Sequence, residues 1–181
     1  MKKLVLVAIF LLGFAAFATA GDAPAVEIFG GYSYVRVNPP SDAGVDSINL
    51  NGWNASLTFN GNKWLGFIAD FGGYYGSPSF GGESADVKAY SVMFGPKVSI
   101  RKGKITPFVQ GLFGFTNLSV AGISENDFSM GFGGGVDINV ADKVAIRPVQ
   151  VEYFGIKEGT SGDFINNFRY SAGIVLKLGK R

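Results

Sequence analysis

The feature that most constrains the fold is an alternation of apolar and small polar residues with a period of two. Between Phe128 and Val140 every second residue is apolar or Gly, and the intervening residues are Gly, Ser, Asp or Asn. The closing stretch from Phe168 to Leu178 alternates in a similar way. Side chains on a β-strand point alternately to its two faces, so this pattern predicts strands with one apolar face. Gly recurs inside most of these stretches and disfavours helix.

The alternation divides the chain into eight segments joined by connectors that are short and long in turn. The expected strands are 25–37, 49–60, 64–76, 87–101, 104–117, 127–141, 143–155 and 166–178. The short connectors are 60–63, 101–104 and 141–143, and the longer polar ones are 38–48, 77–86, 118–126 and 156–165. Tight periplasmic turns alternating with longer outer loops are typical of membrane barrels. We therefore predict an all-β fold, an eight-stranded antiparallel up-and-down transmembrane β-barrel.

The first 20 residues have the pattern of a secretory signal peptide. Lys2 and Lys3 precede an apolar run from Leu4 to Phe17, and Ala18-Thr19-Ala20 matches a small-residue cleavage site. The apolar run is shorter than the ~20 residues that a membrane-spanning helix needs. We expect a signal peptide at 1–20, cleavage near Ala20 and an outer-membrane barrel domain at 21–181.

Period two alone does not say which face of the barrel meets solvent, because a secreted soluble barrel alternates as well. In a soluble barrel the outward set should be rich in Lys and Glu, whereas here the second face carries mostly Gly, Ser, Asn and Thr. Small residues suit a narrow eight-stranded interior, and the apolar face suits lipid. Aromatic residues near the segment ends fit the interface girdles of membrane barrels. They are Tyr32, Tyr34, Trp53, Trp64, Tyr74, Tyr75, Tyr90, Tyr153 and Tyr170.

The same alternation places a set of charged residues inside the barrel. They are Glu27, Asp70, Lys97, Asp137, Glu152, Arg169 and Lys177. Buried charges must be paired or solvated, so we expect a network of ion pairs within the lumen. Such a network either plugs the barrel or gates a narrow polar path, and the small diameter favours the plug.

Arg147 does not fit this arrangement, because the alternation around it turns its side chain toward lipid. Either Arg147 extends to the periplasmic headgroups, or a bulge at Pro148 reverses the register. The sequence leaves both alternatives open.

Composition excludes several kinds of function. The chain has no His and no Cys, so a His-activated nucleophile, a disulfide and a thiolate metal site are ruled out. Its formal net charge is +2, with scattered basic residues, which is no footprint for nucleic acid. We expect no enzymatic activity and no cofactor.

Short motifs occur in a characteristic order along the chain. They lie at 27–34 (EIFGGYSY), 94–97 (FGPK), 106–108 (TPF), 147–153 (RPVQVEY) and 170–178 (YSAGIVLKL). Together they resemble the outer-membrane β-barrel domain family that is related to the transmembrane part of outer membrane protein A. The resemblance implies a bacterial outer-membrane location, insertion by the barrel-assembly machinery and salt bridges in the lumen.

Three functions remain as expectations. The first is a structural, envelope-integrity or small-pore porin-like role, in contact with membrane lipid and lipopolysaccharide and as a monomer. The second is a surface interaction or adhesion protein acting through its outer loops, although these loops are short and polar. The third is a secreted soluble barrel that binds an apolar ligand.

Overall fold

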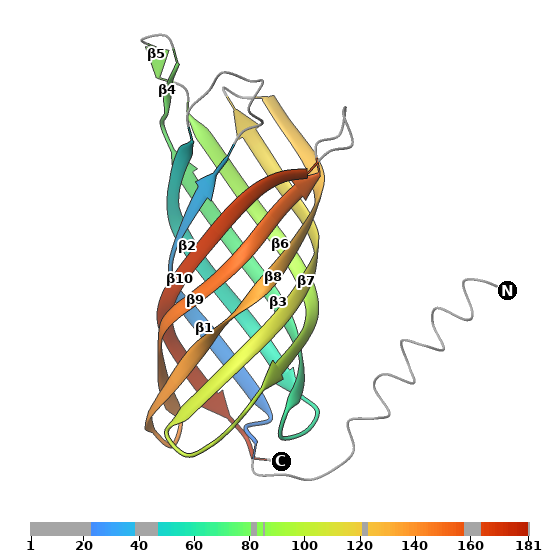
Figure 1. Cartoon of the computed structure of the whole chain (residues 1–181), viewed down its shortest axis with the longest axis vertical. Coiled ribbons are helices and arrows are strands. Elements are labelled where there is room, and N and C mark those ends of the chain that lie inside the picture. The colour runs from blue at the N-terminus through green and yellow to red at the C-terminus, as the bar shows by residue number, and fades with distance from the viewer. Residues whose placement is uncertain are drawn as a thin grey trace, which may run out of the picture.

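The computed structural model describes residues 23–38, 47–80, 83–84, 86–120, 123–157 and 164–180. Its main feature is a closed antiparallel barrel of eight strands, in the ring order β1-β10-β9-β8-β7-β6-β3-β2 (Figure 1). The strands are β1 (Val26–Val37), β2 (Ile48–Asn60), β3 (Leu65–Gly76), β6 (Val87–Ser99), β7 (Ile105–Val120), β8 (Ile123–Ala141), β9 (Val144–Lys157) and β10 (Phe164–Leu178). The predicted fold class is confirmed. The expected signal peptide at 1–20 lies outside the described residues.

Pairing between the first and last strands closes the barrel, with Glu27 opposite Lys177. The start of β1, the end of β10 and the three short turns lie at one end, which we call the short-turn end (Figure 1). In the β6–β7 turn, Gly103 has a φ of 61°, which favours glycine. The opposite end, which we call the long-loop end, carries a separate two-stranded sheet of β4 (Ser79–Phe80) and β5 (Glu83–Ser84).

The prediction of a loop at 118–126 is wrong, because strands β7 and β8 occupy most of this segment. Leu118 pairs with Glu125, and Ser119 pairs with Ser124. The hydroxyls of Ser119 and Ser124 lie 2.6 Å apart, so polar side chains are satisfied across the hairpin. The polar composition of this segment therefore signalled exposure to water rather than a loop. The other expected loops, 38–48, 77–86 and 156–165, lie partly outside the described residues.

The outer face of the barrel is apolar and exposed. Phe115 is 63% exposed and Trp64 is 56% exposed. Aromatic rings on neighbouring strands pack edge to face, as Phe113 does on Phe132 with ring centroids 5.5 Å apart. Such a surface suits contact with hydrocarbon. In the part of the chain that is described, no helix is long and apolar enough to cross a membrane.

Tyr74 is the exception among the aromatic residues assigned to the interface girdles. Its side chain is fully buried inside the barrel, so that assignment is wrong. The reason lies in the alternation, because Tyr74 shares the inward-facing parity of Asp70 on β3.

The position of Arg147 depends on a bulge in β9. Gly173 of β10 pairs with Arg147 and Ser171 pairs with Gln150, so β9 holds one residue more than its partner. Pro148 and the residue after it both face outward, and Arg147 is only 1% exposed. The second alternative from the sequence is therefore correct: a bulge at Pro148 turns Arg147 into the barrel.

Candidate functional site: the filled barrel interior

Four layers of side chains fill the interior of the barrel from the short-turn end toward the long-loop end. We define the first layer as Glu27, Lys97 and Arg101. Glu27 accepts from Lys97 Nζ at 2.9 Å and from Arg101 Nη2 at 2.8 Å. Lys97 and Glu27 are almost fully buried, whereas Arg101 lies at the mouth of the barrel and is partly exposed. One carboxylate thus joins a buried cation to a cation at the mouth.

The second layer is built on Arg147, with Asp137, Phe29 and Phe108. The guanidinium of Arg147 donates to both carboxylate oxygens of Asp137, from Nε at 2.7 Å and from Nη2 at 3.1 Å. It also lies 4.4 Å from the ring centroid of Phe29 and 4.3 Å from that of Phe108. A planar cation that is bidentate to a carboxylate and stacked between rings is held in one orientation. Nζ of Lys97, in the first layer, lies 4.5 Å from the ring centroid of Phe108, so it connects the first layer to the second.

The third layer is centred on Arg169, with Asp70, Glu152 and Tyr74. Arg169 donates from Nη1 to Asp70 at 2.8 Å and from Nε to Glu152 at 2.7 Å. Its Nη1 also donates to the hydroxyl of Tyr74 at 2.8 Å. All four side chains are buried. Arg169 therefore neutralises two carboxylates from β3 and β9 across the interior of the barrel.

Amides connect the second layer to the third. Gln150 accepts from Arg147 Nη1 at 2.7 Å and donates to Glu152 at 2.8 Å. Gln110 donates to the other oxygen of Glu152 at 2.8 Å. The hydrogen bonds therefore run without a break from Asp137 to Asp70, and the whole network is expected to act as one unit.

The fourth layer is apolar and lies mostly in the half of the barrel nearer the long-loop end. Its residues are Val35, Leu50, Ile68, Tyr74, Val87, Ala89, Met93, Leu112, Phe154 and Ile156. Phe154 connects it to the third layer, because its ring centroid lies 6.1 Å from that of Tyr74 and 5.6 Å from the guanidinium of Arg169. Small polar residues were expected inside the barrel, and Ser91, Thr116 and Ser129 are buried in this half as expected. The apolar cluster that accompanies them was not expected.

Six of the residues that the sequence placed in the network take part in ion pairs in the structure. They are Glu27, Asp70, Lys97, Asp137, Glu152 and Arg169. Lys177 differs from them, because it is only partly buried and its Nζ donates to the amide oxygen of Asn139.

Sequence reasoning missed two cations and most of the neutral partners. Arg101 lies beyond the end of β6, although the expected strand 87–101 gives it the inward parity of Lys97. Arg147 was left ambiguous by the bulge. The inward parity of β3 and β7 does identify Tyr74 and Gln110, so the alternation held a usable signal for both.

Within the described part of the chain the network is balanced in charge and leaves no buried carboxylate unpaired. Four carboxylates face four cations: Glu27, Asp70, Asp137 and Glu152 against Lys97, Arg101, Arg147 and Arg169. Among the described residues no group of three or more His, Cys, Asp or Glu side chains is arranged to hold a metal ion. The arrangement is one of mutual neutralisation and dense filling, which suits closing the barrel.

A closed antiparallel barrel with an apolar outer face and a filled, ion-paired interior defines a β-barrel protein of the outer membrane. The sequence profile of the outer membrane protein beta-barrel domain matches residues 4–177, and the chain belongs to this family. A search of curated proteins finds no match. Barrels of the outer membrane have short turns on the periplasmic side, so the short-turn end is the periplasmic end.

Solved structures of outer-membrane barrels share the fold. Neisserial surface protein A (NspA) is 18% identical, with a TM-score of 0.70 over 87% of this chain and 100% of that one. Ail, the attachment invasion locus protein of Yersinia pestis, is 22% identical, with a TM-score of 0.55 over 85% of this chain and 99% of that one. OprG from Pseudomonas aeruginosa is 12% identical, with a TM-score of 0.59 over 88% of this chain and 98% of that one.

Family membership and the apolar outer face together overturn one expectation, the secreted soluble barrel that carries an apolar ligand. In such a barrel the apolar set would point inward and polar side chains would cover the outside. The chain is instead an outer-membrane barrel protein.

Proposed function

We propose that the protein is a closed structural barrel that supports the integrity of the outer membrane, with at most small and intermittent conductance. The observation that carries this proposal is the filling of the interior by three ion-paired layers and one apolar layer. Arg169 and its two carboxylates are fully buried. A permanent aqueous pore would need these side chains to separate and be hydrated one by one.

The same geometry supports a role without enzymatic activity. A general acid and base need carboxyl groups that differ in environment and can reach a substrate. Here the carboxylates of Asp70, Asp137 and Glu152 are buried and each is held by an arginine. The chain also lacks His, the residue that most often transfers protons in catalysis.

The proposal includes the membrane partners. The outward aromatic and aliphatic side chains suit lipid acyl chains, with lipopolysaccharide in the outer leaflet, and the barrel-assembly machinery would insert the chain. All eight strands are paired within one chain, so a monomer satisfies the backbone without a partner.

A second candidate function is surface interaction through the outer hairpins. The supporting observation is the length of β7 and β8, which stay paired as far as Val120 and Ile123. The expectation of short, polar loops does not describe this hairpin. The neighbours NspA and Ail are named as a surface protein and as an attachment invasion protein, which makes an interaction role worth testing.

A complementation experiment separates the two candidates. A strain that lacks the gene is expected to become sensitive to detergent and bulky antibiotics, and the parent gene is expected to restore resistance. A variant with residues 118–125 replaced by an Asn-Gly turn should restore resistance equally well, because the four layers stay intact. Full resistance in the strain that lacks the gene would contradict the structural role. Loss of host-cell binding in the trimmed variant alone would support the surface role.

A further inference from the structure

The periplasmic end of the barrel is strongly basic. In the described part of this end, the short turns and the end of β10 carry one exposed acidic residue, Asp142. The basic residues there that lie outside the ion-paired layers are Lys63, Lys102, Lys104, Lys143, Lys177 and Lys180. Like charges gathered on one rim raise the local concentration of anions.

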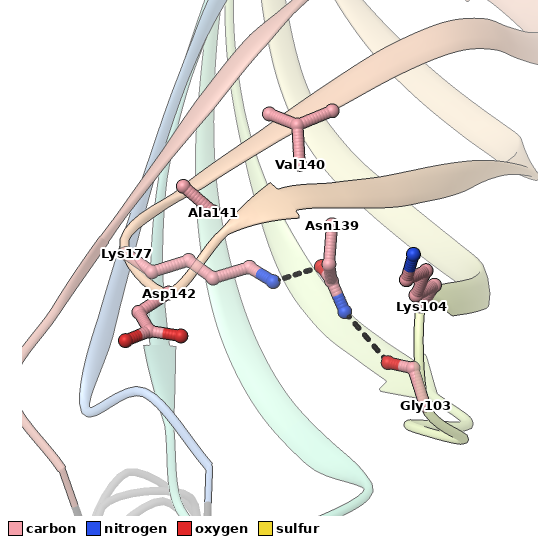
Figure 2. Close-up of a pocket in the computed structure, with 7 residues that line it drawn as sticks. All are labelled: Gly103, Lys104, Asn139, Val140, Ala141, Asp142 and Lys177. Atoms are coloured by element: carbon pink, nitrogen blue, oxygen red, sulfur yellow. Dashed lines mark hydrogen bonds between the residues drawn. The ribbon is translucent and has the colours of Figure 1, made fainter.

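Two adjoining cavities open among these residues. The larger has a volume of about 760 Å³, and Arg101, Lys143, Lys177 and Lys180 line it together with Thr106. The smaller has a volume of about 410 Å³ and is drawn in Figure 2, where Lys104, Asn139 and Lys177 surround it. Asn139 and Lys177 line both cavities. We call the two cavities together the vestibule. A volume of this order suits a small organic ligand.

Lys177 is a lysine of the periplasmic end that the ion-paired network does not include. The four buried carboxylates are each paired with Lys97 or with an arginine, and no ion pair within 4.0 Å involves Lys177 among the described residues. Its Nζ donates to the amide oxygen of Asn139, whose nitrogen donates to the carbonyl oxygen of Gly103 at 3.0 Å (Figure 2). An ammonium group has three donors, so Lys177 is held in direction while donors remain for a ligand.

We propose that the vestibule binds phosphate-bearing anions on the periplasmic side of the membrane. Lys177 supplies the positioned donor at the wall of the barrel, and Lys143 and Lys180 supply charge at the rim. Lysine ammonium groups are common phosphate ligands because they act as point charges. The single carboxylate of Asp142 leaves a clear excess of positive charge. The site does not depend on conductance, because it lies at the periplasmic mouth of the barrel, where Arg101 of the first layer lines it.

The test is a titration at low salt with tripolyphosphate. Calorimetry measures its binding to the folded protein in nanodiscs of zwitterionic lipid. Saturable binding to the parent is expected. Lys177→Gln should weaken binding at least about tenfold, the equivalent of losing one charged hydrogen bond. Lys143→Gln, on the exposed turn, should also weaken it, and it keeps the test valid if Lys177→Gln folds poorly. Lys157→Gln is the matched control, because Lys157 is an exposed lysine at the opposite end of the barrel.

Absence of saturable binding, or equal affinities of the parent, Lys177→Gln and Lys143→Gln, would overturn the proposal. A second titration in nanodiscs with phosphatidylglycerol identifies the source of the phosphate group. Unchanged affinity for tripolyphosphate would support a soluble periplasmic anion. Weaker affinity in the parent would support the same site filled by a lipid headgroup, provided that Lys157→Gln follows the parent and Lys177→Gln shows no such lipid dependence.

Discussion

Replacing Arg169 with Met should lower the free energy of unfolding by about 3–5 kcal/mol, the usual cost of removing one partner from a buried ion pair. Arg169 is fully buried and faces two carboxylates, Asp70 and Glu152. Met keeps an unbranched side chain but is shorter than Arg and carries no charge, so the variant leaves both carboxylates uncompensated in the interior. Urea unfolding in lipid vesicles measures the effect. The heat-modifiable shift on gels gives the folded fraction at each urea concentration.

Two further variants show whether charge or packing is responsible. Lys157→Met removes an exposed cation at the end of β9 and should change stability by no more than about 0.5 kcal/mol. Combining Arg169→Met with Asp70→Asn and Glu152→Gln removes the uncompensated charges together. That triple variant should regain much of the lost stability, since replacing a whole buried ionic group is often neutral. A triple variant no more stable than Arg169→Met would show that packing, and not charge, is decisive.

Deleting Pro148 together with Val149 should prevent stable folding of the barrel. Deleting Pro148 alone would remove only the bulge and leave Arg147 inside. Removing Val149 as well places Gln150 directly after Arg147, so Arg147 turns outward while the strand above it keeps its register. Asp137 then loses its bidentate partner, at a cost of at least about 3 kcal/mol, and an arginine faces lipid. The expected result is loss of the compact, heat-modifiable form after refolding into vesicles.

The matched control for the deletion is Pro148→Ala. This substitution keeps the number of residues in β9, so Arg147 stays inside and stability should change by no more than about 0.5 kcal/mol. Pro148 faces outward in the structure. If the double-deletion variant folded as well as Pro148→Ala, the spacing between Arg147 and Gln150 would not be what directs Arg147 into the barrel.

The strands and their order were predictable because each strand has a distinct chemistry on its two faces. One apolar face against lipid imposes strict period-two alternation, and a shift of one residue would reverse every side chain. The same parity identified Glu27, Asp70 and Arg169 as inward-facing, and it also applies to Tyr74, whose aromatic ring suggested an interface girdle instead.

Other features were outside the reach of the sequence pattern for physical reasons. The inward direction of Arg147 depends on one extra residue in β9, which no local periodicity reveals. The apolar layer was missed because Val35 and Leu50 have the same chemistry as lipid-facing residues, although Val35 shares the inward parity of Glu27. The β7–β8 hairpin was missed because Ser and Asn are typical of loops, although here Asn117 pairs with Asn126 across the strands.

The filled interior is tested most directly by planar-bilayer recording of the refolded parent protein, with insertion verified by the heat-modifiable shift of the same sample. The ion-paired layers around Arg147 and Arg169 and the apolar layer beyond them predict a closed baseline with at most brief, small events. Stable, stepwise conductance that rises linearly with voltage, from most inserted molecules, would contradict a barrel closed by its own side chains.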